Sequence, residues 1–399
     1  MKRLETDILI SGGGVAGLTA AAGFGSAGFR VVCIDPNPPV TEAHKAGADL
    51  RTTAFLQPAK VFLEQAGIWE NLAGSARPLN VMRIVDAGGP EATARVSKDF
   101  EAEEISELPF GWNFPNTLLR KEILNRINAL PNVTFRPGIG FKSMVTRTTS
   151  ALVTLSDGTQ VSAMLVIGAD GRSSPVREAV GIAAKTTRYG QKAVVFAVTH
   201  DLPHDNVSTE VHRTGGPFTL VPLPDYKGQP CSSVVWMEPG RRAYELAELS
   251  ESAFERAATE RSAGVYGSLK LASQRQIWPI IAQIADRLTA ERTALVAEAA
   301  HVVPPIGAQG LNMSLGDIST LLQLAKDRPG DLGDAKMLSD YEKARHKEIS
   351  LRVRGVDALN RASIAGSPLL RDLRAKGIEA LYGVKPVRKA LMKMGLGAK

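Results

Sequence analysis

The sequence feature that most constrains the fold is the run GGGVAG near the N-terminus. Its three glycines stand in G-x-G-x-x-G spacing: Gly12, Gly14 and Gly17. The apolar residues 7–10 before this run predict a short buried strand, and the alanine-rich residues 15–27 after it predict a helix that Gly28 ends. Residues 30–34 predict a second strand, so the chain opens with a βαβ unit.

The chemistry of this turn favours a bound dinucleotide. The first glycine permits a tight turn, the second lets the backbone approach a pyrophosphate, and the third lets helix and strand pack closely. The helix begins near Val15 and Ala16, where its N–H groups and positive dipole end would face the phosphate. Asp35 ends the second strand, 18 residues after Gly17, where a carboxylate binds ribose hydroxyls. Because strand, helix and acid occur together, we expect a dinucleotide site rather than a plain glycine-rich turn.

Length and composition indicate a folded protein of two or three lobes. The chain has 399 residues, of which 44% are hydrophobic and 22% charged. No apolar run approaches the roughly 18 to 20 residues that span a bilayer, and the N-terminus lacks the order of a secretory signal. The two cysteines, Cys33 and Cys231, lie far apart, and neither they nor the histidines have metal-ligand spacing. We therefore expect a reduced cytoplasmic protein without a metal site.

The net charge of +7 is concentrated at the C-terminus. Residues 341–399 hold 14 Lys and Arg against 5 Asp and Glu, and the other 340 residues hold 34 against 36. Such a distribution argues against a nucleic-acid groove through the body of the protein. It favours a local anionic partner, such as a membrane surface.

Hydrophobic periodicity changes along the chain and indicates its organisation. From about residue 187, short strand-like runs broken by Pro, Gly and Asp predict an antiparallel sheet, and after Gly310 the pattern is mostly helical. We expect an α/β fold in which a Rossmann-like nucleotide-binding domain is interrupted by an antiparallel-sheet substrate domain, with a C-terminal helical tail. The predicted limits are 1–75, 100–182 and 282–330 for the first domain, 76–99 and 183–281 for the second, and 331–399 for a basic helical region.

Two later segments also place a carboxylate directly after a predicted strand. In LVIGADGRSSPVRE, Asp170 follows a strand at 164–167. In TALVAEAAHVVPPIGAQGLNMSLGD, Glu298 follows a strand at 294–296, and a helical pattern opens at Asn312. The glycine fingerprint alone does not decide whether the dinucleotide is NAD or FAD. These later segments are the part of the sequence that distinguishes the two.

In this order, the fingerprint, the GADG segment and the late loop resemble the class A FAD-dependent monooxygenases, the p-hydroxybenzoate-hydroxylase-like enzymes. Residues 49–72, DLRTTAFLQPAKVFLEQAGIWENL, look like the D-x-R-x-x-A-L segment of the UbiH/UbiF-type hydroxylases of ubiquinone biosynthesis, with Phe55 in place of Leu. The segment AHVVPPIGAQGLNMSLGDI is similar to their isoalloxazine loop. The resemblance covers nearly the whole chain and implies FAD as cofactor and NAD(P)H as co-substrate.

The resemblance also implies roles for three residues in the middle of the site. Arg51 would reach a phosphate or the flavin-side sugar, since a guanidinium pairs phosphate oxygens bidentately. Arg120 matches the family arginine near the cofactor, and Asp170 would fix a loop near the FAD and nicotinamide sites. The alternatives are a solvated loop for Arg51, a solvated helix face for Arg120 and a purely structural turn for Asp170.

The late loop is expected to form the ring end of the flavin site. By resemblance, Glu298 would accept hydrogen bonds from the ribityl hydroxyls, and Pro305, after Pro304, would form a wall beside the isoalloxazine. Backbone at the start of the following helix would face the negative charge of the reduced ring. The residues concerned are Gly307, Gly310, Leu311 and Asn312.

The late loop departs from the family pattern at two places. Ala297-Glu298 replaces the usual Gly-Asp, and Ala308 stands where the family sequence GQG begins. The longer Glu298 side chain would keep its contact only if the strand end lies slightly farther from the cofactor. His301 is expected to have a structural role rather than one in acid–base chemistry.

The implied function is hydroxylation of an aromatic ring with NAD(P)H and O2 through a flavin C4a-hydroperoxide. The implied substrate is a polyprenylated phenol in ubiquinone biosynthesis. A monooxygenase of a soluble phenol or polyketide stays open, as does a non-catalytic flavin-fold protein that binds a prenyl lipid. A plain NAD dehydrogenase is a weaker alternative.

The basic tail predicts an amphipathic helix. Leucines and isoleucine recur between Arg and Lys at approximate helical spacing: Leu369, Leu370, Leu373, Ile378 and Leu381. This helix could lie on an anionic membrane or pack on the FAD domain. The expected location is therefore cytoplasmic, with a peripheral site on the inner face of a bacterial plasma membrane as one option. Other ubiquinone-biosynthesis proteins are further candidate partners, nucleic acid is not expected, and the oligomeric state stays open.

Overall fold

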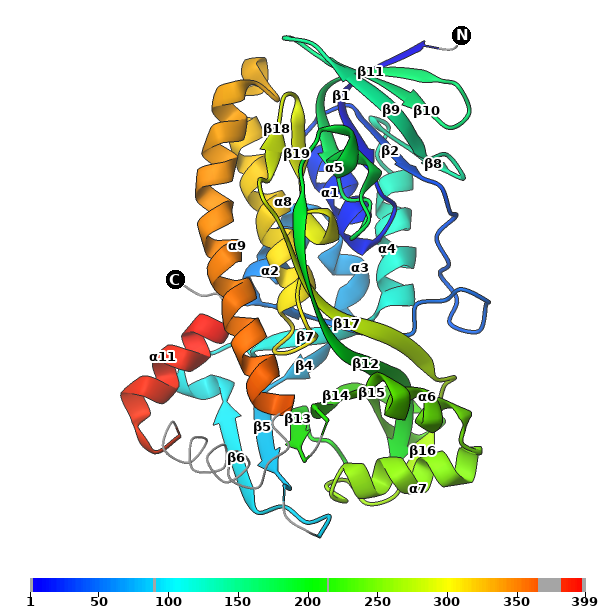
Figure 1. The fold of residues 1–399 in the computed structure, drawn as a ribbon, viewed down its shortest axis with the longest axis vertical. Coiled ribbons are helices and arrows are strands. Elements are labelled where there is room, and N and C mark those ends of the chain that lie inside the picture. The colour runs from blue at the N-terminus through cyan, green and yellow to red at the C-terminus, as the bar shows by residue number, and fades with distance from the viewer. Residues whose placement is uncertain (1–2, 89–90, 214, 365–381, 397–399) are drawn as a thin grey trace.

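A computed structural model describes residues 3–88, 91–213, 215–364 and 382–396 of the chain. In this part, the strands form three β-sheets, with helices against them (Figure 1). The largest hydrophobic core lies around the first sheet and the helices that cover it, and a second core lies between the antiparallel sheet and two helices. No helix in the described ranges is long and apolar enough to cross a membrane.

The first sheet has eight described strands around a parallel centre. β1 (Arg3–Ser11) lies between β2 (Val31–Asp35) and β11 (Gln160–Gly168), and it is parallel to both. The parallel set is completed at its two sides by β8 (Val133–Pro137) and β19 (Thr293–Leu295). The antiparallel additions are β9 (Phe141–Thr146), β10 (Ala151–Leu155) and β18 (Thr289–Ala290). Parallel pairs need a crossover, and α1 (Val15–Ser26) supplies it between β1 and β2.

The second sheet has nine described strands and is almost entirely antiparallel. β12 (Ala184–His200) is its long central strand, paired on one side with β15 (Gln229–Pro239) and on the other with β17 (Gln276–Ala285). The parallel pair in it joins β5 (Val81–Asp86) to β13 (Val207–His212). The remaining strands are β6 (Val96–Glu101), β14 (Pro217–Tyr226), β16 (Leu269–Leu271) and β20 (His301–Val302).

A small third sheet and the remaining helices connect these two layers. The small sheet holds β3 (Thr52–Leu56), β7 (Gly111–Pro115) and β4 (Arg77–Leu79). The α-helices after α1 are α2 (Gln57–Gln65), α3 (Trp69–Ala73), α4 (Asn116–Asn128), α5 (Pro175–Ala179), α6 (Gly240–Glu248), α7 (Glu251–Arg261), α8 (Gln309–Asp327), α9 (Ala335–Ile364) and α11 (Lys385–Leu396). Short 3-10 turns occur at Ala102–Glu104, Ala297–Ala299 and Pro329–Asp331.

The predicted fold class is confirmed: a Rossmann-like parallel sheet is combined with an antiparallel sheet and C-terminal helices. The observed ends of helices and strands differ from the predicted ends by a few residues. The helix predicted to open at Asn312, for example, begins at Gln309. The predicted domain limits stay a prediction, since strand pairing crosses them. For example, β20 at 301–302 pairs with β17 of the antiparallel sheet. The amphipathic tail predicted around 369–381 lies outside the described residues.

A buried ion network anchors α8 beneath the late loop. Asp317 is fully buried and accepts hydrogen bonds from His301 Nε2 at 2.6 Å and Arg345 Nε at 2.9 Å. Burial acts to raise the pKa of Asp317, but the charges and hydrogen bonds of His301 and Arg345 hold it below its ordinary value of 3.8. The hydrogen bond from His301 Nε2 to Asp317 thus holds the loop against α8, which is the kind of structural role predicted for this histidine.

We predict that Asp317→Asn lowers the free energy of unfolding by about 3 kcal/mol, because it leaves Arg345 buried beside an uncharged amide. Asp340→Asn, which breaks a pair with Lys336 on the exposed side of α9, is the control and should cost less than about 1 kcal/mol. Urea unfolding at neutral pH measures both. Equal losses in the two variants would contradict the assignment.

The same network predicts a pH dependence. A carboxyl whose folded pKa is lowered contributes stability above its unfolded pKa and loses it as the pH falls through the folded pKa. For Asp317 this window lies below 3.8. Urea midpoints of the parent and Asp317→Asn should therefore differ by a constant amount from pH 7 to 5 and converge only below about pH 4. If the two urea midpoints already converged at pH 6, the lowered pKa of Asp317 would be contradicted.

Candidate dinucleotide-binding site

The glycine turn after β1 leaves no room for side chains at Gly12, Gly13 and Gly17. Gly12 has a φ of +122°, and a Cβ there would lie 2.2 Å from the carbonyl oxygen of Ala169. A Cβ on Gly17 would lie 1.9 Å from the carbonyl oxygen of Gly12. The backbone N–H of Gly12 donates to Ile34 O at 2.8 Å, which ties the turn to β2. These contacts match the tight turn and the close helix–strand packing predicted for the first and third glycines.

The middle glycine faces open space. A Cβ on Gly14 would meet no atom of the described residues within 4 Å, apart from its neighbours in the chain. Gly14 is also the N-cap residue of α1, and it provides no side-chain hydrogen bond to the first turn at Val15 and Ala16. An uncapped helix N-terminus next to open space fits a pyrophosphate.

Asp35 lies beside this turn, at the end of β2. Its Oδ2 accepts from the backbone N–H of Gly13 at 2.6 Å, and its Oδ1 accepts from Asn37 N at 2.8 Å. The two backbone donors orient the carboxylate toward the turn. Binding of a ribose by Asp35 stays a prediction, for which this position is suitable.

Arg51 belongs to a buried network centred on Asp49. The guanidinium of Arg51 pairs bidentately with this carboxylate, from Nε and Nη2, at 2.8 Å each. Asp49 also accepts from Asn116 Nδ2 at 3.0 Å and from Arg120 Nη2 at 3.5 Å. Burial acts to raise the pKa of Asp49, but these partners, Arg51 foremost, lower it below 3.8. The network thus brings together two predicted cofactor residues, Arg51 and Arg120.

Arg51 also contacts the antiparallel sheet. Its guanidinium carbon lies 4.0 Å from the ring centroid of Trp278, on β17. Gln276 of the same strand donates from Nε2 to Ala48 O at 2.7 Å, which fixes the loop before Arg51. Burial acts to lower the pKa of Arg51, but Asp49 and the charge of Glu298 raise it above its ordinary value. Glu298 and Arg51, 247 residues apart in the sequence, therefore lie within electrostatic reach of each other.

The GADG loop lies directly against the glycine turn. Ala169 N donates to Ser11 O at 2.8 Å, and Asp170 Oδ2 accepts from Val176 N at 3.1 Å and from Ser11 Oγ at 3.3 Å. Burial is the largest influence on Asp170 and raises the pKa of its carboxyl, which these hydrogen bonds partly oppose. This geometry fixes the loop, and a role of Asp170 near the FAD and nicotinamide sites stays a prediction.

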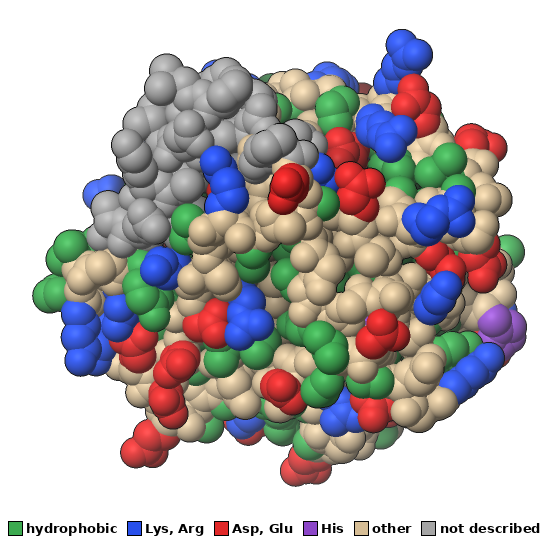
Figure 2. Space-filling model, turned by 90° about the horizontal axis from the view of Figure 1, so that it is seen from below, with side chains coloured by type: hydrophobic (Ala, Val, Ile, Leu, Met, Phe, Trp, Pro, Cys, Tyr) green, Lys and Arg blue, Asp and Glu red, His purple; other side chains and the backbone are tan. Residues whose placement is uncertain are grey.

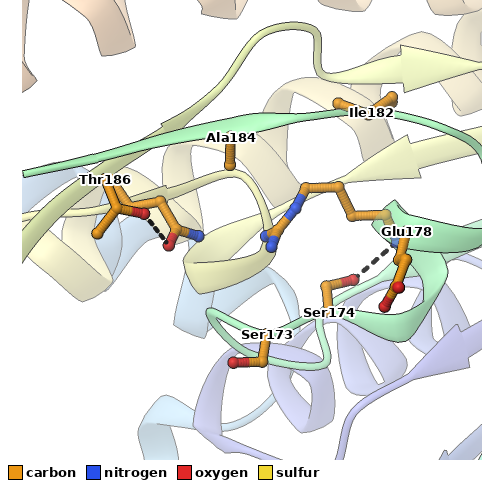
Figure 3. A pocket seen from close by; sticks show the side chains of 8 residues that line it. Ser173, Ser174, Glu178, Ile182, Ala184 and Thr186 are labelled. Atoms are coloured by element: carbon orange, nitrogen blue, oxygen red, sulfur yellow. Dashed lines mark hydrogen bonds between the residues drawn. The ribbon is translucent and has the colours of Figure 1, made fainter.

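A hollow of about 270 Å³ lies on the far side of the same loop. Figure 3 shows Ser173 and Ser174 on one side of it, with Ala184 and Thr186 of β12 on the other. Arg177 in this hollow donates from Nη1 to Ala299 O at 2.8 Å, beside Glu298. Gly14 does not line this hollow, in which Arg177 bonds to the late loop and Gln283 donates from Nε2 to Arg172 O at 2.9 Å.

The late loop contains two alanines in the left-handed region. Ala297 has a φ of +56° and Ala308 a φ of +55°, and these are the two positions where the family pattern has glycine. The strand before the loop is tied to the GADG segment, since Val296 N donates to Gly168 O at 3.0 Å. Glu298 itself is exposed. Its predicted cofactor contact therefore needs no displacement of a protein partner among the described residues.

The remaining late-loop residues lie at the start of α8. Pro305, Gly307 and Gly310 are exposed, and Leu311 and Asn312 are half-buried. The Asn312 side chain holds the loop to β3: its Nδ2 donates to Ala54 O at 2.7 Å and its Oδ1 accepts from Leu56 N at 2.8 Å. A contact between Asn312 and a cofactor is thus left to its backbone, and α8 has no side-chain N-cap.

The polar atoms left over in the site fit a flavin dinucleotide. Among the described residues, three buried polar atoms here have no hydrogen-bond partner: Arg120 Nε, Trp278 Nε1 and Asp170 Oδ1. Two are donors, which suit phosphate or carbonyl oxygens, and one is a carboxylate acceptor, which suits a hydroxyl; a dinucleotide carries partners of both kinds. No group of three or more His, Cys, Asp or Glu in the described ranges is arranged to hold a metal ion.

Three residues were missed by sequence reasoning: Asp49, Asn116 and Trp278. Asp49 stands in the D-x-R segment, so its spacing from Arg51 was a usable signal. Asn116 is the first residue of α4, and an amide side chain at the start of a helix was a weaker signal in the sequence. Trp278 had no sequence signal, because its contact with Arg51 depends on how β17 packs against a loop 227 residues earlier.

Comparison with known proteins identifies the class. Residues 5–354 match the sequence model of the FAD binding domain family. Ubiquinone hydroxylase UbiL of Rhodospirillum rubrum is 33% identical over 397 residues, covering 98% of this chain and 89% of that protein. Mitochondrial ubiquinone biosynthesis monooxygenase COQ6 of Homo sapiens is 28% identical over 443 residues, with 97% and 91% covered.

The fold is also that of solved flavin-dependent enzymes. The structure of p-nitrophenol 4-monooxygenase PnpA from Pseudomonas putida covers 100% of both chains, with a TM-score of 0.79 and 18% identity. Fold, site and sequence therefore define a flavoprotein of the monooxygenase type. The chain belongs to the FAD binding domain family, and the resemblance to class A FAD monooxygenases is confirmed.

We predict that Gly14→Ala and Gly17→Ala act in different ways. Gly14→Ala should fold normally and weaken FAD binding by about 1 to 3 kcal/mol, because the methyl group enters the ligand's space. Gly17→Ala should destabilise the protein itself by about 3 kcal/mol, because the methyl group meets Gly12 O. Flavin titration and thermal unfolding of the FAD-free proteins separate the two. A normally stable Gly17→Ala variant would contradict the packing role.

We also predict that Ala297→Gly raises the free energy of unfolding by about 0.5 to 1 kcal/mol, because it relieves a left-handed alanine. Ala299→Gly is the matched control in the same short turn. Ala299 is buried and has no positive φ, so its change should be destabilising. The account fails at this position if both variants lose stability equally in chemical unfolding.

Proposed function

We propose that the protein is an FAD-dependent hydroxylase that uses NAD(P)H and O2 to hydroxylate a polyprenylated phenol in ubiquinone biosynthesis. The observation that supports this proposal is that the uncapped glycine turn borders open space at Gly14, while the charge of Glu298 acts on Arg51, which pairs with Asp49. Similarity to UbiL and COQ6 over nearly the full length supports the substrate class.

The residues divide the binding of FAD between them. The N-terminus of α1, with Gly14, Val15 and Ala16, would hold the pyrophosphate, and Asp35 the adenosine ribose. Arg51 and Arg120 would balance phosphate charge from within their shared network with Asp49.

The late loop would bind the isoalloxazine end of FAD. Glu298 would accept hydrogen bonds from the ribityl hydroxyls, while Pro305 and Gly307 would lie beside the isoalloxazine and exclude water from it. The N-terminus of α8, with Gly310 and Leu311, would stabilise negative charge on the reduced ring. When bound, FAD supplies the hydride-accepting and oxygen-activating chemistry, and the protein supplies position and shielding.

The wider setting follows from the same proposal. The phenol ring would lie between the flavin-binding domain and the substrate domain. We assign the flavin-binding domain to residues 1–75, 100–182 and 282–330. The substrate domain, with the antiparallel sheet, takes residues 76–99 and 183–281. The long apolar substrate favours a cytoplasmic protein that works at the inner face of the bacterial plasma membrane, with other ubiquinone-biosynthesis proteins as neighbours.

The decisive test of function combines the purified protein with genetics. The protein should retain oxidised flavin, oxidise NAD(P)H faster when a prenylated phenol is added, and transfer one atom of ¹⁸O2 to the product. Expression in bacterial strains that each lack one ring hydroxylase should rescue quinone synthesis in at least one, and the intermediate that disappears identifies the carbon. NAD(P)H oxidation that no phenol accelerates, together with no rescue, would overturn the proposal.

We predict that Glu298→Ala weakens FAD retention by about 1 to 3 kcal/mol, because the ribityl hydroxyls lose their acceptor. Glu178→Ala, at an exposed site on α5, is the control and should bind FAD like the parent. Fluorescence titration of released flavin measures both. Unchanged affinity in Glu298→Ala would remove this residue from the site.

A further inference from the structure

Helix α11 is attached to the molecule by a small inner face. Met392 is 7% exposed and packs in an apolar cluster with Leu79, Ala102 and Phe110. Arg388 pairs with Glu104 at 2.7 Å from Nη2. Most other described residues of this helix are exposed. A helix held by so few buried contacts opens at low cost compared with the core helices.

The outer surface of α11 combines apolar and basic side chains. Val387 and Leu391 are each 41% exposed and lie four residues apart on one side of the helix, and Val384, just before the helix, is 51% exposed. Three lysines follow one another every four residues: Lys385, Lys389 and Lys393. Figure 2 shows hydrophobic and basic side chains together at the left edge of the molecule, where α11 lies in Figure 1.

The apolar cluster under Met392 continues to the late loop. Ala54 and Leu56 of β3 belong to this cluster, and both are bonded through their backbone to Asn312 at the start of α8. The first residue of α8, Gln309, donates from Nε2 to Gly395 O on α11 at 3.2 Å. The apolar cluster under Met392 is thus linked through β3 to Asn312, at the start of α8 and next to the predicted isoalloxazine end of the flavin site.

We propose that α11 docks on the surface of an anionic lipid bilayer and that Met392 closes the path through which the prenyl chain of the substrate enters. The chain would displace Met392 and lie against Leu56, Leu79 and Phe110, with its phenol ring at the flavin. The second part rests on the proposed function, whereas the docking of α11 does not.

Charge decides which partner fits the outer face. Residues 380–399 contain five Lys and Arg and no Asp or Glu. An anionic bilayer attracts such a segment and accepts the valines and leucine between its headgroups. A second copy of the chain would instead bring two positive helices together, which repel each other.

The docking step is tested by sedimentation of the full-length holoprotein with vesicles. Vesicles of phosphatidylcholine with about 30% phosphatidylglycerol should bind it at least about tenfold more strongly than phosphatidylcholine alone. Val387→Asp combined with Leu391→Asp should abolish this binding, whereas Val145→Asp, at a 62% exposed valine on β9, should not. Equal binding by parent and double variant would overturn the proposal, as would a concentration-dependent dimer that the double variant loses.

The entry path is tested by a specificity ratio. Met392→Glu should lower kcat/KM for a long-chain prenylated phenol at least about tenfold more than kcat/KM for a short-chain one, because the charge stands in the chain's path. If the ratio of kcat/KM for the long-chain phenol to that for the short-chain phenol did not change, entry of the prenyl chain past Met392 would be disproved. If neither phenol is turned over by the parent, the proposed function fails, while the vesicle experiment still decides whether α11 docks.

Discussion

The buried carboxylate of Asp49 is the interaction on which the site depends. It holds Arg51 bidentately, accepts from Asn116 at the start of α4, and lies within reach of Arg120. Through Arg51 it also fixes the stack on Trp278 of the antiparallel sheet. A buried charge without partners is costly, so this loop can adopt few other positions. The loop that holds Arg51 is therefore joined to the antiparallel sheet at residues that would meet the cofactor under the proposed function.

The late loop shows a second constraint, which is conformational. Ala297 and Ala308 hold left-handed backbone where glycine would be relaxed, and α8 beneath them is anchored by Asp317. Strain of this kind persists only where the surroundings fix the backbone. Alanine at these two positions thus holds a left-handed backbone at a cost in stability. Glu298 is exposed, and its charge contributes to the raised pKa of Arg51.

The sequence predicted those parts of the structure that depend on local pattern. The turn from β1 into α1, Asp35 at the end of β2, and the carboxylates after two later strands all follow from periodicity and glycine spacing. The contacts that complete the site could not be predicted in this way. Trp278 stacks on Arg51 and Asn312 bonds to β3, 258 residues away, because of how the sheets pack, and no local pattern encodes that packing.

The central claim is that one flavin dinucleotide joins segments from both ends of the chain. Hydrogen–deuterium exchange of the FAD-free and FAD-loaded protein tests it most directly, since ligand contact protects backbone amides. We expect FAD to slow exchange in three separate segments together: residues 12–17, 49–53 and 296–312. Protection confined to the βαβ unit, with no change in the late loop, would contradict it.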